Sequence, residues 1–247
     1  MLTAFKKLFR NDAAGAPFAA VAVDMHAHVL PGIDDGADTL EKSLEMIAAL
    51  GELGYRKLIL TPHIMGDFYR NTPAGIREKL ALVQAAVKEK GWEMELDCAA
   101  EYYLDEWFLD KVTGEEPLLS FGDNYVLIET SYINDPLNFK EIIFSLKAAG
   151  YTPVLAHPER YTYLYNRFDA LLEMYETGVL LQININALSG YYSQAARKVA
   201  EKLIDLKLVH FIGTDAHHIR HLEMLPKAVA SPYFKKALAL PLRNPQL

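Results

Sequence analysis

The chain of 247 residues has only one cysteine, Cys98. No intramolecular disulfide can form, which predicts a reducing compartment, the cytoplasm. Thiolates also cannot dominate a metal site, because such sites use several of them. Cys98 falls in an alternating stretch that indicates a strand, so we interpret it as a buried, unreactive thiol rather than a catalytic nucleophile.

Long apolar runs and an excess of positive charge are also lacking. No stretch reaches the eighteen or so apolar residues of a membrane-spanning helix, so we expect no stable membrane insertion. The formal net charge is −7, which argues against nucleic-acid binding because phosphate contacts need a basic surface. An anionic substrate would therefore need a local positive centre, such as metal ions or a suitably placed arginine.

The N-terminal residues superficially resemble a secretory signal. Lys6, Lys7 and Arg10 precede an apolar run over residues 13–23. We reject a signal because the run leads directly into a polar cluster, and cleavage nearby would remove the first expected strand. We predict that residues 1–17 form an N-terminal arm, frayed rather than docked on a membrane or partner, and that residues 18–247 form one domain.

Strand-like and helix-like segments alternate along the rest of the chain, with no linker or low-complexity tract between them. Leu40, Leu44 and Ile47 follow the helical period. The expected strands cover residues 18–23, 57–60, 93–100, 124–128, 152–156, 179–185 and 209–213. The expected helices cover residues 39–53, 73–90 (capped by Thr72), 139–149, 167–176, 191–206 and 222–240. About seven strand–helix units predict a parallel sheet, either open or closed as a barrel.

Imidazole and carboxylate side chains stand at the ends of most of these expected strands. His26 and His28 are two residues apart, so they should point to the same side of the chain. The full set of candidates is His26, His28, Asp35, His63, Glu101, Glu129, His157, Asp215 and His217. An open sheet gathers such residues only at its switch point, whereas a barrel brings all of them to one mouth. We therefore predict an α/β fold, a single-domain barrel of about seven strands.

This donor set indicates metal chemistry, although each residue taken singly could be a helix cap or a solvated side chain. Nitrogen and oxygen donors without thiolate suit manganese, iron or zinc, and nine ligands indicate more than one ion. Closely spaced divalent ions can share a hydroxide and clamp a phosphoryl group. Arg160, three residues after His157, could bind a phosphate oxygen. A surface salt bridge with Glu159 or Asp169 is the alternative.

These motifs, in this order, resemble a known superfamily. They are the HxH motif His26-Ala27-His28, Asp34-Asp35-Gly36, Thr61-Pro62-His63, Glu101 before two tyrosines, His157-Pro158-Glu159-Arg160 and Gly213-Thr214-Asp215-Ala216-His217. The set spans residues 23–217 and resembles the PHP (polymerase and histidinol phosphatase) superfamily. Within it, the similarity is to bacterial metal-dependent protein-tyrosine phosphatases encoded with capsule and exopolysaccharide genes. The resemblance implies a distorted (β/α)7 TIM-like barrel, three divalent ions, usually manganese, and the phosphotyrosine tail of a membrane-associated tyrosine kinase as substrate.

The resemblance also implies a role for each residue. The first ion would be held by His26, His28, Glu101 and Asp215. Glu101 would bridge to a second ion, held also by Glu129 and His157. The third ion would be held by Asp35, His63 and His217. Arg160 would bind the phosphate, and Asp215 and His217 are candidates for the catalytic acid.

Three alternatives stay open. The first is another PHP phosphoesterase that acts on a small phosphomonoester such as histidinol phosphate. The second is an amidohydrolase, which also builds HxH metal sites on a barrel but usually bridges two ions with a modified lysine, where this chain offers Glu129. The third is a module that binds phosphorylated kinase tails without turning them over.

Overall fold

The structure, a computed structural model, describes residues 16–114 and 116–247. The expected arm over residues 1–17 lies almost entirely outside the described residues, so that arm and its boundary stay predictions. None of the helices in the described ranges is both long and apolar enough to cross a bilayer.

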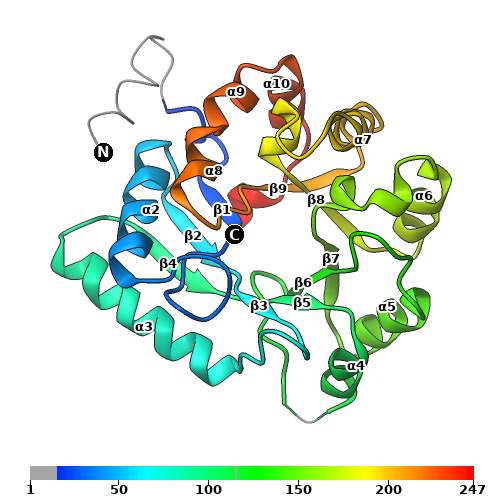
Figure 1. The fold of residues 1–247 in the computed structure, drawn as a ribbon, viewed down its shortest axis with the longest axis horizontal. Helices are drawn as coiled ribbons and strands as arrows, with labels where there is room; N and C mark the ends of the chain where they lie inside the picture. Colours follow the sequence, from blue (N-terminus) through cyan, green and yellow to red (C-terminus); the bar gives the residue numbers. More distant parts are fainter. Residues whose placement is uncertain (1–15, 115) are drawn as a thin grey trace.

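Parallel strands arranged in a ring form the centre of the molecule (Figure 1). The strands are β1 (Val23–Ala27), β2 (Lys57–Leu60), β3 (His63–Ile64), β4 (Glu95–Cys98), β5 (Glu101–Tyr103), β6 (Tyr125–Glu129), β7 (Thr152–Leu155), β8 (Leu180–Asn184) and β9 (Val209–Gly213). They form two hydrogen-bonded sheets, in the orders β1-β2-β4 and β3-β5-β6-β7-β8-β9. Since β3 follows β2 and β5 follows β4 after breaks of two residues each, the strands occupy seven positions around the ring.

The ring is completed where β1 meets the residues after β9. An isolated parallel bridge joins Ala27 to Ala216. Beside it, the Asp215 N–H donates to the His26 carbonyl at 2.8 Å and the His28 N–H donates to the Ala216 carbonyl at 3.0 Å. This seam, and the division into two sheets, make the ring irregular. The predicted distorted (β/α)7 barrel in a single domain is confirmed.

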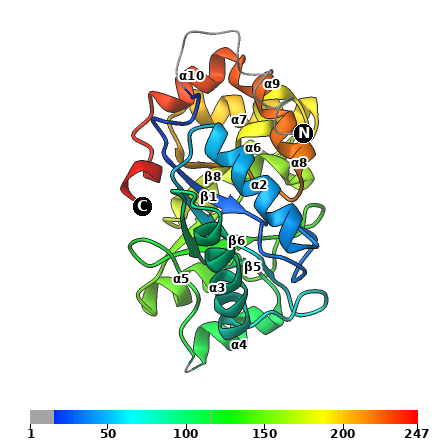
Figure 2. The same ribbon diagram turned by 90° about the vertical axis from the view of Figure 1, so that its left-hand side faces the viewer.

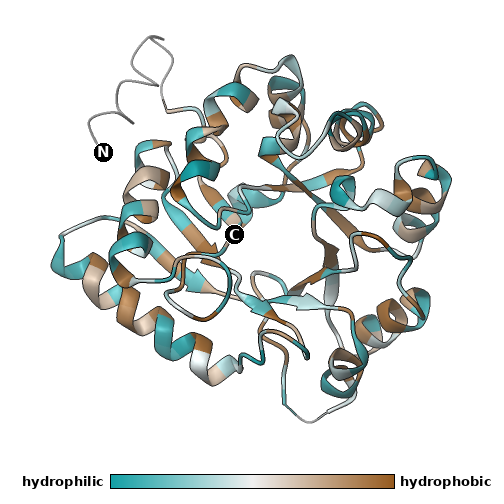
Figure 3. Ribbon diagram, viewed as in Figure 1, coloured by the Kyte–Doolittle hydropathy of each residue, from teal (hydrophilic) through white to brown (hydrophobic). Residues whose placement is uncertain are grey.

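Helices surround the ring on its outside (Figure 1) and cover the strands when the molecule is viewed from the side (Figure 2). They are α2 (Leu40–Glu52), α3 (Pro73–Glu89), α4 (Glu106–Thr113), α5 (Phe139–Ala148), α6 (Phe168–Glu176), α7 (Gln194–Asp205), α8 (Ile219–Glu223), α9 (Leu225–Val229) and α10 (Pro232–Leu238). Figure 3 shows brown and teal stretches on the same helices, as expected of helices with one face on a core and the other on water. On α2, for example, Met46, Ile47 and Leu50 are buried.

Side-chain caps set the starts of several helices. The hydroxyl of Thr39 accepts the Lys42 N–H at 3.3 Å, and that of Thr72 accepts the Gly75 N–H at 3.1 Å. Both caps satisfy N–H groups that have no partner within the helix. The helices predicted after these residues are confirmed. Helix α4 was not predicted, because its eight residues are too few to show a clear period.

The prediction for the first strand was wrong. Residues 17–21 form turns, and Ala22 takes a left-handed backbone conformation with φ of 61°. Phe18 is buried and stacks on Tyr55, with ring centroids 4.9 Å apart. The apolar run therefore reflects packing in the core and not an extended strand. As a consequence, His26 lies inside β1 rather than beyond the end of a strand.

Two further strand ends differ from the prediction. The strand expected over 93–100 stops at Cys98, and Glu101 instead opens the short strand β5. His63 likewise opens β3, and the two residues are direct register partners in adjacent parallel strands. The break in each strand thus places an imidazole and a carboxylate side by side.

Two packed clusters of apolar side chains hold the barrel together. The larger lies between the strands and the helices. The smaller joins residues from strands all around the ring and so fills its interior, with Met25, Leu127, Val154 and Phe211 among its members. Protein interiors pack densely, so this smaller cluster excludes polar side chains from the middle of the ring. The polar ligand candidates lie at one end of it.

Candidate metal centre

All nine predicted metal ligands converge on one cluster. Their donor atoms form four overlapping groups, and within each group all the donors lie within 4.8 Å of one another. The groups are His28, Asp35, His63 and His217; His26, His28 and Glu101; His26, His157 and Asp215; and His63, Glu101 and Glu129. Asp35 is half exposed, and the other eight side chains are largely or wholly buried.

The irregular path of β1 places the first two imidazoles. The pairing of β1 with β2 shifts register between Asp24 and Ala27. Such irregularities redirect side chains and are frequent beside active sites. Met25 consequently packs in the inner apolar cluster, while His26 and His28 bring their Nε2 atoms to 3.2 Å from each other. The prediction that the two imidazoles point to the same side is confirmed.

The Nε2 atoms of His26 and His28 face the same two carboxylate oxygens. His26 Nε2 lies 3.3 Å from Glu101 Oε2 and 3.4 Å from Asp215 Oδ1. His28 Nε2 lies at the same two distances, 3.3 and 3.4 Å, from those oxygens. Two donors bonded to one ion at about 2.0–2.2 Å and at a tetrahedral angle lie about 3.3–3.6 Å apart, close to these separations. These residues therefore fit one divalent ion.

Gln182 and Asp34 determine which ring nitrogen of His26 and of His28 carries the proton. Gln182 Oε1 accepts the His157 N–H at 3.3 Å, which identifies it as the amide oxygen. It therefore also accepts a hydrogen bond from His26 Nδ1, at 3.0 Å. Asp34 Oδ2 accepts from His28 Nδ1 at 2.8 Å. With both Nδ1 atoms protonated, both Nε2 lone pairs face the cluster, as in metal-bound histidines.

Glu101 connects this first group of donors to a second one. Its Oε1 atom lies 2.9 Å from His157 Nε2, while its Oε2 atom lies 3.2 Å from His63 Nδ1. Glu129 reaches the same region, 3.1 Å from His63 Nδ1 and 4.0 Å from His157 Nε2. One carboxylate thus faces two sets of donors through its two oxygens, which is the geometry of a bridging ligand.

Asp35 faces the two imidazoles on the outer side of the cluster. Its Oδ1 atom lies 3.5 Å from His63 Nε2 and 3.4 Å from His217 Nε2. His217 Nδ1 donates to the Asp215 carbonyl at 3.0 Å, so its Nε2 lone pair is directed to Asp35. Since Asp35 is half exposed, this third group of donors opens to solvent.

The electrostatics of the cluster match a cation site. Burial raises the pKa of Glu101, but His26 and His63 lower it more, so it stays well below the usual value. Burial likewise raises the pKa of Asp215, and His26 and His217 lower it more. Within the described chain, Glu101 Oε2 and Asp215 Oδ1 are buried without a hydrogen-bond donor. Buried anionic oxygens of this kind are stabilised by metal ions.

Arg160 belongs to the cluster and does not form the alternative surface salt bridge. Its Nη1 atom donates to Asp215 Oδ2 at 2.5 Å. The guanidinium lies between two aromatic rings, with its carbon 4.7 Å from the Tyr132 centroid and 4.5 Å from the Tyr192 centroid. The Tyr132 ring also stacks on His157 at 5.8 Å. Arg160 is therefore held in place while its side chain stays 23% exposed.

Sequence reasoning missed the residues that orient the cluster. Gln182, Asn184 and Tyr192 were not predicted to belong to the site. Asn184 donates to Asp215 Oδ2 at 2.6 Å and to the Tyr192 hydroxyl at 3.1 Å. Glu159 was considered only as a salt-bridge partner of Arg160. It is wholly buried and accepts the Asn184 N–H at 2.8 Å. Burial raises its pKa to about 8. Polar residues inside the apolar run Leu-Leu-Gln-Ile-Asn were the available signal.

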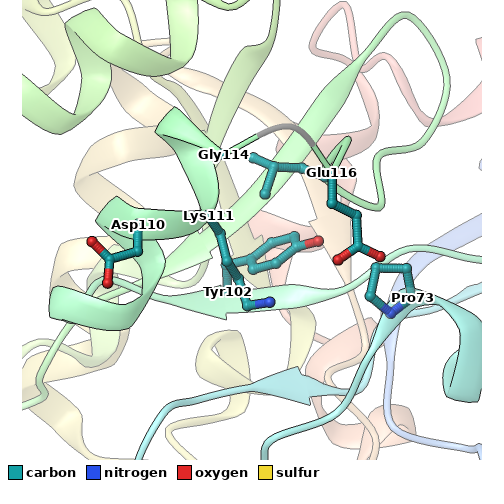
Figure 4. Close-up of a pocket in the computed structure, with 7 residues that line it drawn as sticks. Pro73, Tyr102, Asp110, Lys111, Gly114 and Glu116 are labelled. Atoms are coloured by element: carbon teal, nitrogen blue, oxygen red, sulfur yellow. The ribbon is translucent and has the colours of Figure 1, made fainter.

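A separate hollow of about 220 Å³ lies beside α4, lined in part by Tyr102, Lys111 and Glu116 (Figure 4). It shares no residue with the cluster. Tyr102 follows Glu101 along β5 and points to the opposite side, where its hydroxyl accepts the Leu119 N–H at 2.7 Å. Tyr102 is thus a core residue and not part of the mouth of the barrel.

Comparison with known proteins agrees with this geometry. A family described as "Capsular polysaccharide synthesis, CpsB/CapC" matches residues 22–233. The tyrosine-protein phosphatase YwqE of Bacillus subtilis is 31% identical over 207 residues, which are 80% of this chain and 78% of YwqE. The tyrosine-protein phosphatase CpsB of Streptococcus pneumoniae is 26% identical, covering 91% of this chain and 96% of CpsB.

Solved structures show the same fold. One, from work on YwqE and CpsB described as unique metal-dependent tyrosine phosphatases, has a TM-score of 0.76 at 28% identity and covers 90% of this chain and 94% of the other. The phosphotriesterase homology protein of Escherichia coli aligns at a TM-score of 0.52 and 16% identity, a likeness of fold alone. Since the family match extends over most of the sequence, this chain belongs to the CpsB/CapC family of capsular polysaccharide synthesis proteins.

Proposed function

We propose that this protein is a metal-dependent protein-tyrosine phosphatase. Its substrate in this proposal is the phosphotyrosine tail of a membrane-associated tyrosine kinase that controls capsule or exopolysaccharide synthesis, and its location is the cytoplasm. The observation that carries the proposal is the convergence of nine nitrogen and oxygen donors beside Arg160. The activity named for the relatives YwqE and CpsB supports it.

The donor sets support three divalent ions. We assign the first ion to His26, His28, Glu101 and Asp215. We assign the second to Glu101, Glu129 and His157, and the third to Asp35, His63 and His217. Manganese is the proposed metal, with iron or zinc as alternatives, because nitrogen and oxygen donors suit all three. When bound, such ions activate water as a nucleophile and neutralise charge on the phosphoryl oxygens.

Arg160 supplies the fixed positive charge for the phosphate. One of its five N–H groups donates to Asp215, which leaves the others for phosphate oxygens. Because the guanidinium is already held by Asp215 and two tyrosine rings, little ordering is needed when a phosphate binds. Donors fixed in this way stabilise the negative charge that develops on the phosphoryl group.

The leaving group needs little help from an acid. A phenolate has a conjugate acid with a pKa of about 10 and departs more readily than an alkoxide. Neither of the two predicted candidates is well placed as the acid. The pKa of Asp215 is held well below the usual value. His217 donates its Nδ1 proton to the Asp215 carbonyl and directs its Nε2 lone pair to the third group of donors, so as a metal ligand it has no proton to give.

Metal removal and one conservative variant test the proposal. Wild-type protein loaded with Mn²⁺ should hydrolyse a phosphotyrosine peptide faster than histidinol phosphate, lose this activity in EDTA and regain it with Mn²⁺. Glu101→Gln should lower kcat/KM by at least about 100-fold, because a neutral amide cannot bridge two cations. The exposed Glu176→Gln on α6 serves as the matched control and should behave as wild type.

Three results would contradict the proposal. Faster turnover of histidinol phosphate would favour the small-molecule phosphoesterase. Tight binding of the peptide without turnover in any metal would favour a phosphotyrosine-binding module. Full activity of the Glu101→Gln variant would refute the assigned metal centre.

A further inference from the structure

A groove of about 410 Å³ opens beside the metal centre. One wall is formed by residues 36–38 and the adjoining face of α2, and the other by residues 217–220 at the start of α8. Helices α2 and α8 are neighbours in the fold (Figure 1). The function proposed above makes no use of this space.

The groove is continuous with the metal centre. His217 lines the groove and also faces Asp35 across the outer group of donors, at 3.4 Å. Gly36, on the opposite wall, directly follows Asp35. A substrate whose phosphate lay in the centre would therefore have this groove beside it for the rest of its chain.

We propose that the groove binds the residues next to phosphotyrosine in an acidic peptide substrate. This inference rests on the proposed function and adds to it the sequence preference of the enzyme. The groove would thus distinguish a phosphotyrosine peptide from a small aryl phosphate, which ends at the ring.

Hydrogen bonds already hold one wall of the groove, formed by residues 36–38, in place. The Ala37 N–H donates to the His28 carbonyl at 3.1 Å, and the Gly32 N–H donates to the Ala37 carbonyl at 2.8 Å. The Gly36 N–H donates to Asp34 Oδ1 at 2.9 Å. A groove held by such bonds needs little ordering when a peptide enters, which favours affinity.

The charges of the groove select the peptide. Ile219, which is half-buried, provides apolar surface for a side chain. Asp38 and Lys42 neutralise each other at 2.8 Å. Arg220 is exposed, and no acidic residue within the described ranges forms an ion pair with it. It is therefore available to a carboxylate of the substrate, whereas Glu45 on the α2 wall disfavours a second acidic side chain there.

Charge reversal at Arg220 tests the inference. The substrates are two phosphotyrosine peptides, one with glutamates and one with lysines beside the phosphotyrosine, and p-nitrophenyl phosphate. We expect Arg220→Glu to lower kcat/KM for the acidic peptide about fivefold relative to p-nitrophenyl phosphate, and to improve the lysine peptide relative to the acidic one. Binding affinities should change in the same way, as measured by fluorescence anisotropy with peptides that carry a non-hydrolysable phosphonate in place of the phosphate.

The matched control is Lys140→Glu, an exposed charge reversal on α5, across the barrel from α2 and α8 (Figure 1). It should leave the relative rates of all three substrates as in wild type. Equal changes for both peptides in Arg220→Glu, or no change, would overturn the inference. A wild-type protein that hydrolysed none of the three substrates would instead contradict the proposed function, so the two failures are distinguishable.

Discussion

At the scale of single residues, the site depends on side chains that hold other side chains. Arg160 is the clearest case, since its position is set by Asp215 and by the rings of Tyr132 and Tyr192. Tyr132 also donates to Glu129 Oε2 at 3.4 Å and stacks on His157. Arg160 and two proposed metal ligands thus share one supporting residue.

The contribution of the Tyr192 ring to the positioning of Arg160 can be measured directly. Tyr192→Leu removes the cation–π contact, so we expect the Kd for inorganic phosphate and the KM for a phosphotyrosine peptide to rise about three- to tenfold. Tyr192→Phe keeps the ring and loses only the bond from Asn184, so its phosphate affinity should stay close to that of wild type. Calorimetric titration of the Mn²⁺-loaded protein gives the Kd, and equal affinities for Leu and Phe would show that the ring does not position Arg160.

At the scale of elements, the loop between β1 and α2 is fitted closely to the strand end that carries His28. A Cβ atom on Gly36 would lie 2.1 Å from the His28 carbonyl oxygen, far inside van der Waals contact. Only glycine therefore allows this loop to approach the strand. The approach in turn places Asp34 against His28 and leaves Asp35 facing His63 and His217.

We expect Gly36→Ala to push the loop away from His28 and to lower both stability and metal content. Overpacking of this kind costs about 1–3 kcal/mol of unfolding free energy, and the purified variant should contain less bound metal by elemental analysis. Gly51→Ala, in α2, is the control, because its new Cβ would meet only Met94 Cε at 3.4 Å. It should raise the unfolding free energy by about 0.5–1 kcal/mol. Wild-type metal content in Gly36→Ala would contradict this account of the loop.

At the scale of the whole molecule, the seam between β1 and β9 has a second attachment, three residues before the proposed ligands His26 and Asp215 in each strand. Asn244, wholly buried, donates to the carbonyls of Val23 and Ile212 at 3.1 and 2.8 Å and accepts the Ile212 N–H at 3.0 Å. One side chain near the end of the chain thus joins the first strand to the last strand.

Asn244→Ala should open this seam at its second attachment. It leaves buried backbone groups of Val23 and Ile212 without partners, so we expect a loss of about 3 kcal/mol in the free energy of unfolding by urea. The neighbouring Gln246→Ala is exposed and should cost less than about 0.5 kcal/mol. A loss as small for Asn244→Ala as for Gln246→Ala would show that the seam is held without this residue.

The sequence alone determined the donor chemistry and its place along the chain. The order of the motifs and the regular alternation of strands and helices predicted the barrel, the family resemblance and all nine ligand candidates. These features are local, because residue type and spacing express them directly. The apolar run over residues 18–23 shows the limit of such reasoning, since it signals burial equally well for a strand and for packed turns.

Only the tertiary structure decided how these parts meet. The bulge in β1, the breaks before His63 and Glu101, and the tyrosine rings around Arg160 all depend on contacts between residues far apart in the chain. The same holds for Gln182 orienting His26 and for Asn244 joining β1 to β9. A single sequence states which side chains are available, but packing around the closed ring fixes their distances and orientations, and those set what the site can bind.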